Sequence, residues 1–277
     1  MRKTITLVIG IFISAASFAS QSNFESPKSY IESCVPPSMS CVQSCVLCPV
    51  SYVTSLTPTV TVYLIPGQGS DSRVFKNIQF EENIDTINIH YPVPFENESM
   101  KEYALRISKQ IDTTKPFILI GVSLGGMIAC ELTDIIHPEK VIIISSASSS
   151  EEVPKMYTFF KTFPVYREIS PNIFKYSSYF LQPLYEPDRK LEKETCVSML
   201  HAKDPLFIKR AVHLIVSWDR TEADNINKNI IHIHGDIDNT LPIDKIKADY
   251  IIKGGSHMMV LTKSEEISGI IEREIKN

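Results

Sequence analysis

The chain has 277 residues, of which 43% are hydrophobic, so it is long enough to form one large core. Its formal net charge is −4, its sequence pI is about 6.0, and its lysines and arginines are scattered rather than clustered. This balance does not favour nucleic acid or an anionic membrane surface as a partner. No run of about 18 or more apolar residues occurs in the body of the chain, so the sequence predicts no membrane span there.

Residues 1–19 have the pattern of a secretory signal peptide. Arg2 and Lys3 form a basic start, an apolar run follows, and small residues up to Ala19 precede a cleavage site ahead of Ser20. The alternative is an uncleaved anchor or an amphipathic end. We therefore expect an exported protein, periplasmic or secreted, that keeps no stable membrane span after cleavage.

Residues 20–57 contain much Ser, Pro, Asn and Thr without steady periodicity, which predicts an extended leader. In an oxidising compartment its four closely spaced cysteines could form two disulfides, in any of three pairings. These cysteines are Cys34, Cys41, Cys45 and Cys48. Their spacings match no zinc pattern, so the sequence predicts no metal site, and the alternative is a linker with free thiols.

From Thr59 onward, short runs rich in Ile and Val alternate with helical patterns. Such continuous runs predict strands covered on both faces. The six runs are 59–66, 86–93, 116–122, 140–147, 229–236 and 249–255. Helices are predicted at 99–111, with Ser99 as N-cap, at 125–138 and at 263–276. The alternation predicts an α/β fold, a mostly parallel sheet with helices on both faces.

The segment 148–227 breaks this alternation, because it lacks strand runs and is rich in aromatic residues and prolines. We interpret it as a helical cap, inserted between the strand ending near 147 and the one starting near 229. Tyr157, Phe160 and Trp218 are candidates for lining an apolar pocket beneath it. The alternative is that the aromatic rings form the core of the cap itself.

The stretch "ILIGVSLGGM" places Ser123 between Gly121 and Gly125, directly after an apolar run and before a helical pattern. A sharp turn between a strand and a helix needs glycine on both sides, because Cβ atoms would collide there. The serine hydroxyl would then be exposed at the carboxyl end of the sheet. The spacing G-x-S-x-G in this context predicts a nucleophile elbow.

A serine nucleophile needs a base, an acid to orient that base, and donors for the oxyanion. His257 lies in a Gly-Ser loop after the last predicted strand, and Asp236 and Asp238 follow the strand before it. The other six histidines lie in predicted strands, helix ends or the cap, and we interpret them as structural: His90, His137, His201, His213, His232 and His234. For the oxyanion, the expected donors are the backbone N–H groups of Leu124 and Gln68.

Residues 58–277 resemble the α/β-hydrolase superfamily, in particular its cap-bearing, esterase- and lipase-like branch with a serine nucleophile. The resemblance is carried by "LIPGQGSDSRVF", "GVSLGG", "GDIDNTLP" and "GGSHMM". It implies that Asp238, the later acid of its loop, reaches His257, while Asp236 caps the turn. Two features depart from the pattern: Pro66-Gly67 replaces the usual His-Gly, and His257 follows Asp238 by only 19 residues. The helix between these two residues must therefore be very short or absent.

The motifs together predict a serine hydrolase that cleaves a carboxylic ester or related acyl compound through an acyl-serine intermediate. No metal or organic cofactor is expected, and the partner is a small-molecule substrate with an apolar acyl part. The same three residues also serve acyl transfer, thioester, amide or carbon–carbon bond cleavage, and lyase reactions. A ligand-binding protein that keeps these residues without turnover is the remaining alternative. Neither the substrate nor the oligomeric state follows from the sequence.

Overall fold

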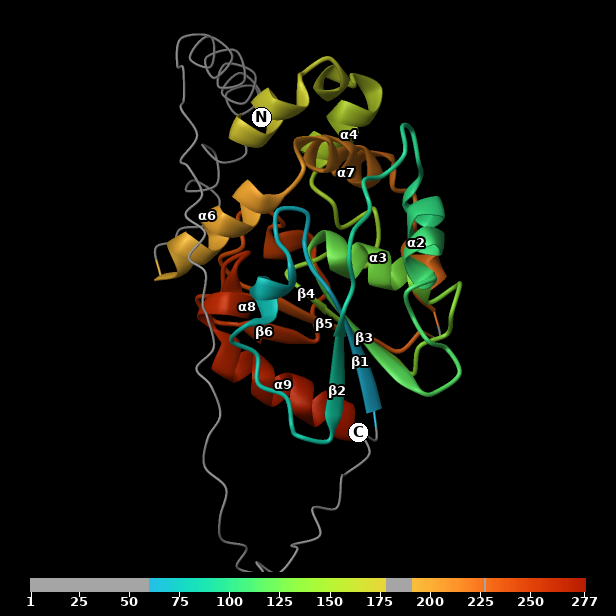
Figure 1. Cartoon of the computed structure of the whole chain (residues 1–277), viewed down its shortest axis with the longest axis vertical. Helices are drawn as coiled ribbons and strands as arrows, with labels where there is room; N and C mark the ends of the chain where they lie inside the picture. The colour runs from blue at the N-terminus through green and yellow to red at the C-terminus, as the bar shows by residue number, and fades with distance from the viewer. Residues whose placement is uncertain (1–59, 178–190, 227) are drawn as a thin grey trace, which may run out of the picture.

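The computed structural model describes residues 60–177, 191–226 and 228–277 (Figure 1). The signal peptide, the leader and its four cysteines lie outside these residues and stay predictions. So do the domain boundary near residue 58 and the part of the cap segment at 178–190.

The core of the molecule is a sheet of six strands, all parallel, in the order β2-β1-β3-β4-β5-β6. The strands are β1 (Val60–Ile65), β2 (Ile84–Asn88), β3 (Phe117–Val122), β4 (Lys140–Ile144), β5 (Ile230–Gly235) and β6 (Tyr250–Ile252). The strand order reverses between β1 and β3, and in open α/β sheets ligands bind at the carboxyl ends of the strands beside such a point. The predicted parallel α/β architecture is confirmed.

The second strand differs from its prediction, since it covers Ile84–Asn88 rather than 86–93. Pro92 and Pro94 have no N–H to give to a strand ladder, and the N–H of His90 bonds the side chain of Gln110 instead, at 3.0 Å. The apolar pattern therefore continues beyond the residues that pair with β1.

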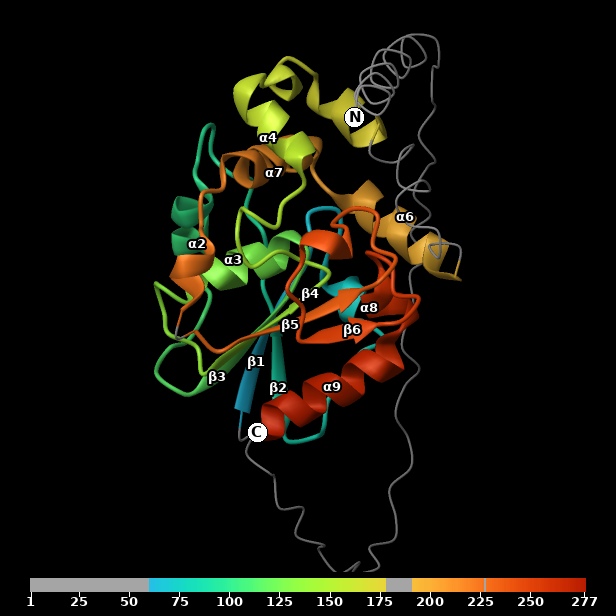
Figure 2. The same cartoon turned by 180° about the vertical axis from the view of Figure 1, so that it is seen from behind.

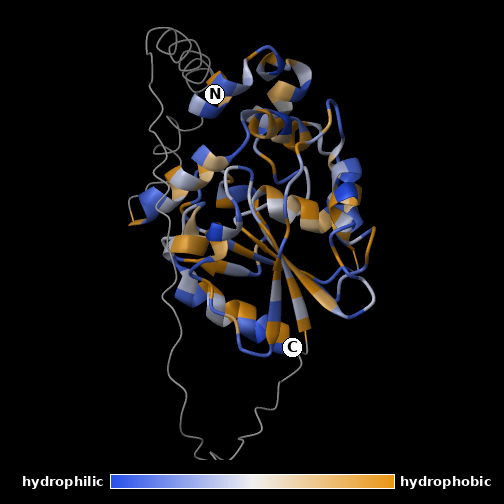
Figure 3. Ribbon diagram, in the orientation of Figure 1, coloured by the Kyte–Doolittle hydropathy of each residue, from blue (hydrophilic) through white to orange (hydrophobic). Residues whose placement is uncertain are grey.

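Helices cover both faces of the sheet (Figure 1; Figure 2). One face packs against α2 (Met100–Ser108) and α3 (Leu124–Leu132), the other against α8 (Met259–Thr262) and α9 (Ser264–Lys276). Alternate residues of the strands join the two cores: Leu119 faces α2 and α3, whereas Ile120 faces the side of α9. Figure 3 shows the apolar colour of the central strands, as expected for strands covered on both faces.

The helix α2 begins as its sequence predicts. The side chain of Ser99 accepts the Glu102 N–H at 3.2 Å, and the Glu102 carboxylate accepts the Ser99 N–H at 2.9 Å. This capping box satisfies two N–H groups at the start of the helix. Tyr103 and Ile107, one turn apart on this helix, are fully buried.

The described residues between β4 and β5 are helical or irregular. The elements are α4 (Lys155–Thr162), η2 (Val165–Arg167), a helix at 171–177, α6 (Lys193–Ala202), α7 (Pro205–Ser217) and η4 (Glu222–Asn225). In Figure 1, α4, α6 and α7 lie at one end of the sheet. Between Asp238 and His257 the structure has only the turn η5 (Ile243–Lys245) and the three-residue β6. The helix between these two residues is thus reduced to a single turn, as the short spacing predicts.

One other element completes the described chain. The turn η1 (Ser72–Phe75) follows β1 and packs with α6 and α8. None of the helices in the described ranges combines the length and the apolar composition needed to cross a bilayer.

Candidate active site

The turn from β3 into α3 holds Ser123 in a backbone conformation that few residues adopt, with φ 54° and ψ −121°. A Cβ on Gly121 would lie 2.4 Å from the carbonyl oxygen of Gly125, and one on Gly125 would lie 2.1 Å from that of Ile65. Both distances are far shorter than a van der Waals contact. The two glycines of G-x-S-x-G are therefore required by the close approach of α3 to β3 and β1, as the spacing predicts.

Gly125→Ala should destabilise the protein by about 3 kcal/mol or more, because its Cβ would meet backbone that cannot move aside. Gly269→Ala is the matched control, since it is an exposed position inside α9 with nothing within 4 Å of the added Cβ. It should stabilise the protein by about 0.5–1 kcal/mol. Urea unfolding of the two variants measures both effects, and equal free energies of unfolding would contradict the packing argument.

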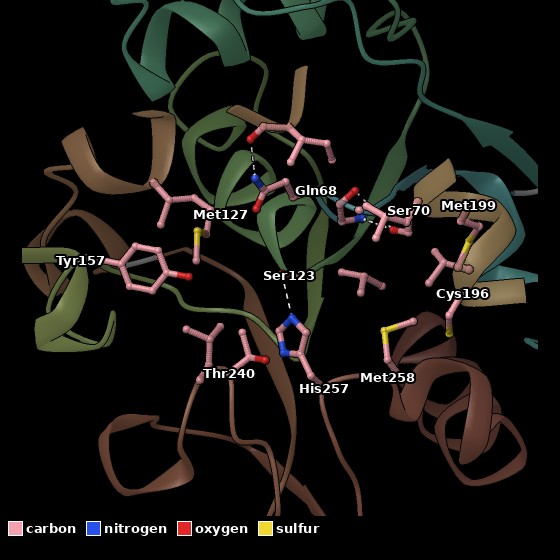
Figure 4. Close-up of a pocket in the computed structure, with 18 residues that line it drawn as sticks. Gln68, Ser70, Ser123, Met127, Tyr157, Cys196, Met199, Thr240, His257 and Met258 are labelled. Carbon is pink, nitrogen blue, oxygen red and sulfur yellow. Dashed lines mark hydrogen bonds between the residues drawn. The ribbon is translucent and has the colours of Figure 1, made fainter. Parts of the chain in front are cut away.

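His257 lies between Ser123 and Asp238. Its Nε2 is 3.0 Å from Ser123 Oγ (Figure 4). Its Nδ1 is 2.8 Å from Asp238 Oδ2. Because a carboxylate only accepts hydrogen bonds, the Nδ1 proton points to Asp238 and Nε2 can accept the serine hydroxyl. The loops after β3, β5 and β6 thus bring together three residues that are up to 134 positions apart.

Asp238 is buried and held in one orientation. Its Oδ1 accepts the N–H groups of Thr240 at 2.8 Å and Leu241 at 2.9 Å. Burial opposes ionisation of this carboxyl, but the charge and hydrogen bond of His257 and the Leu241 N–H outweigh it, so the pKa of Asp238 lies below its ordinary value. Asp238 is therefore ionised at neutral pH.

Asp236 has a different partner. Its Oδ1 accepts the N–H of Gly254 at 2.6 Å, in an exposed position, and so joins the loop after β5 to the loop after β6. Of the two aspartates, the structure places Asp238 and not Asp236 against His257. This is the arrangement that the family resemblance implied.

The loop after β1 lies beside the serine. A Cβ on Gly67 would be 3.3 Å from that of Ser123, and the Gly67 N–H bonds Ser70 Oγ at 2.8 Å. The side-chain amide of Gln68 donates to the Ile208 carbonyl at 2.7 Å, which ties this loop to α7 (Figure 4). The backbone N–H groups of Gln68 and Leu124 donate to no other group in the described part of the chain. Both amides are therefore available to a bound ligand.

A cavity of about 260 Å³ opens at Ser123 and His257. Its wall is largely apolar, with Leu200 from α6 and Ile208 and Ile215 from α7. In Figure 4, Met127 and Tyr157 lie on one side of the serine, and Cys196, Met199 and Met258 on the other. The cavity can therefore hold an apolar group next to the serine hydroxyl.

Only one of the three aromatic candidates, Tyr157, lines this cavity. Trp218 is buried elsewhere, where its indole N–H donates to Glu131 at 2.8 Å, and Phe160 packs edge-on against Tyr166 with 6.1 Å between ring centroids. The Phe160 ring thus packs within the helical segment, which was the alternative interpretation, whereas Trp218 joins this segment to α3 in the main core. The aliphatic and sulfur-bearing lining gave no signal in the sequence, because periodicity does not show which residues of a short helix face a cavity.

Sequence analysis also missed one neighbour of Asp238. His234, interpreted as a structural histidine, has its Nε2 3.5 Å from Asp238 Oδ2. The signal that could have found it is its place on β5, in the same strand–loop unit as the acid. In the described ranges, no three His, Cys, Asp or Glu side chains are grouped so that they could hold a metal ion.

No protein-family model matches the sequence, and no curated protein matches it. Solved structures do match. The esterase EaEST from Exiguobacterium antarcticum superposes with a TM-score of 0.59 at 15% identity, covering 78% of this chain and 92% of its own. A lipase-esterase related protein from Clostridium acetobutylicum superposes with a TM-score of 0.58 at 16% identity, covering 78% of this chain and 94% of its own. A bromoperoxidase from Bacillus anthracis superposes with a TM-score of 0.58 at 17% identity, covering 80% of this chain and 93% of its own.

The chain has the α/β-hydrolase fold. The resemblance seen in the sequence is thus confirmed at the level of the fold, across nearly the whole length of the matched proteins. The α/β-hydrolase fold hosts many reactions, so the reaction has to be argued from the site.

Proposed function

We propose that this α/β-hydrolase-fold protein is a serine hydrolase that cleaves a carboxylic ester or a related acyl compound. The observation that carries the proposal is the hydrogen-bonded series from Ser123 Oγ through His257 to Asp238, with distances of 3.0 and 2.8 Å. This geometry matches what a serine nucleophile needs, namely a base within reach and an acid that fixes the tautomer of that base.

In the proposed reaction, Ser123 Oγ attacks the acyl carbon while His257 Nε2 takes the hydroxyl proton. The carbonyl oxygen becomes an oxyanion, which the N–H groups of Leu124 and Gln68 stabilise. His257 then gives its proton to the leaving alkoxide, which departs as an alcohol and leaves an acyl-serine. A water molecule, deprotonated by His257, releases the carboxylic acid and restores Ser123.

Two features of the site support the stabilising role of the backbone. The Leu124 N–H lies at the start of α3, where the helix dipole favours negative charge. The Gln68 N–H belongs to a loop whose position is fixed at Ser70, at Ile208 and through Pro66, whose carbonyl accepts the Tyr91 hydroxyl at 2.6 Å. Donors that are fixed in advance need no reorganisation when the oxyanion forms.

A fluorophosphonate probe tests the proposal, because it reacts with an activated serine whatever the natural substrate is. We expect stoichiometric labelling of the purified protein, with the adduct located on Ser123 by peptide mass spectrometry. A protein that binds ligands without turnover would not be labelled. Product analysis with ester, thioester and amide substrates would then separate the reactions that share this site.

The cavity predicts a preference among acyl chains. Ile215 on α7 contributes an aliphatic side chain to its wall, and Ile215→Trp would fill part of the 260 Å³. We expect kcat/KM for p-nitrophenyl octanoate to fall roughly 10-fold or more while that for the acetate changes little. Leu105→Trp, on the exposed side of α2, is the control and should leave both values unchanged. An equal loss for both esters would argue against an acyl site at Ile215.

A further inference from the structure

Two histidines are buried in the core beside the candidate site. His232 and His234 occupy alternate positions of β5, so their side chains leave the same face of the strand. They are 2% and 0% exposed. Burying two imidazoles among aliphatic side chains is costly unless their nitrogen atoms find partners.

The partners of His234 fix its tautomer. Its Nε2 lies 2.8 Å from the carbonyl oxygen of Leu241, which can only accept, so the proton is on Nε2. The Nδ1 of the neutral ring is then an acceptor, and it receives the Nε2–H of His232 at 3.2 Å, with the rings almost perpendicular at 85°. The proton arrangement of the pair is therefore determined by one backbone carbonyl.

The Nε2 atom of His234 also lies near the acid of the site. It is 3.5 Å from Asp238 Oδ2, the oxygen that receives the Nδ1–H of His257. Leu241 connects the two residues a second time. Its carbonyl accepts the His234 Nε2–H, and its N–H donates to Asp238 Oδ1. His234 thus fixes the turn that carries Asp238 and lies with its Nε2 3.5 Å from the oxygen that binds His257.

The His234 ring is neutral in this arrangement. Burial lowers its pKa, and burial together with His234 lowers the pKa of His232 to about 3. The titratable groups around the His234 ring are His232 on β5, Asp238 on the loop after β5 and His257 on the loop after β6. A charged His234 would compete with the imidazolium of His257 for Asp238, and burial prevents this competition.

We propose that His234 is a positioning residue that limits the proton affinity of His257 through the contact of its Nε2 with Asp238 Oδ2, 3.5 Å away. This inference rests on the proposed serine-hydrolase function. A neutral N–H next to the oxygen withdraws part of its negative charge, so the carboxylate stabilises the His257 imidazolium less than it otherwise would. Without the His234 N–H, His257 should hold its proton to a higher pH.

The test is the rate of fluorophosphonate labelling as a function of pH, which needs no knowledge of the substrate. In His234→Met, which keeps much of the volume but loses the N–H, the midpoint of the acidic limb should rise by about 0.5–1 pH unit. The plateau rate should fall about fivefold, because the turn carrying Asp238 loses a hydrogen bond. His234→Gln restores a neutral N–H donor and should return the midpoint to the wild-type value.

His232→Met is the matched control, since His232 is equally buried on the same face of β5 but directs its Nε2–H to His234 rather than towards Asp238. It should lower thermal stability to a similar degree and leave the midpoint unchanged. An unchanged or lower midpoint in His234→Met, with stability lost as in His232→Met, would overturn the inference. Wild-type protein that is not labelled at all would instead overturn the proposed function.

A second measurement needs no variant, in case His234→Met does not fold. In ¹⁵N-histidine-labelled wild type, NMR should show His234 neutral and protonated on Nε2 at neutral and alkaline pH. A charged ring at neutral pH, or a proton on Nδ1, would overturn the inference.

Discussion

Replacing Ser123 by alanine should abolish fluorophosphonate labelling and lower ester turnover roughly 10⁶-fold, to the level that binding and the backbone donors alone sustain. The physical reason is that the Ser123 hydroxyl is the one placed 3.0 Å from His257 Nε2 in the cavity. The measurement is single-turnover hydrolysis of a p-nitrophenyl ester together with labelling. Thermal melting should show that the fold persists, because the Ser123 backbone bonds to Ile144 and Ser146 do not involve its hydroxyl.

Ser72→Ala is the control for this experiment, because Ser72 is an exposed serine on the turn η1 that follows the proposed oxyanion loop. It should label and turn over like the wild type. Full turnover in Ser123→Ala would remove the hydrolase proposal altogether, since the proposed reaction needs the hydroxyl 3.0 Å from His257 Nε2.

Asp238→Asn should lower turnover roughly 10⁴-fold while the protein stays folded. An asparagine can offer its N–H₂ to His257 Nδ1, which would place the imidazole proton on Nε2, where it cannot accept the Ser123 proton. The measurement is kcat for one p-nitrophenyl ester near pH 8, with urea unfolding to check stability. The loss should appear in kcat rather than in KM, because Asp238 is buried and reaches the substrate only through His257.

Asp236→Asn is a matched comparison two residues away. Its side-chain carbonyl can still accept the Gly254 N–H, so turnover should change less than about threefold. If Asp236→Asn lost most of its turnover and Asp238→Asn kept nearly wild-type turnover, the assignment of the acid would be wrong, although the role of Ser123 would stand.

Local features of the sequence predicted the scaffold of the site. The Ile- and Val-rich runs predicted the parallel sheet because its central strands, such as β3, are covered on both faces and therefore carry apolar side chains at successive positions. Gly121 and Gly125 predicted the turn at Ser123 because a missing Cβ is a local requirement of a close approach, here to the carbonyl oxygens of Gly125 and Ile65. The Ser99 capping box likewise depends on residues only three positions apart.

Other features were decided by the tertiary structure. The sequence offered Asp236 and Asp238 as equal candidates on chemistry, and the resemblance alone favoured the second. Their different partners depend on how the loops after β5 and β6 meet. The lining by Ile208 and Ile215 rather than by Trp218 depends on which side of a helix faces the sheet. The contact of His234 with Asp238 depends on the turn that brings Leu241 back over β5.

One physical cause separates the features that the sequence determined from those that the tertiary structure decided. Propensity, capping and steric exclusion act between residues that are close in the chain, so the sequence determined the strands, the helix start and the serine turn. Hydrogen bonds between distant loops, such as that from Ser123 to His257 across 134 positions, form only when the strands pair in one order and the helices pack in one orientation. That packing is a property of the whole chain, and it decided which of the candidate side chains meet.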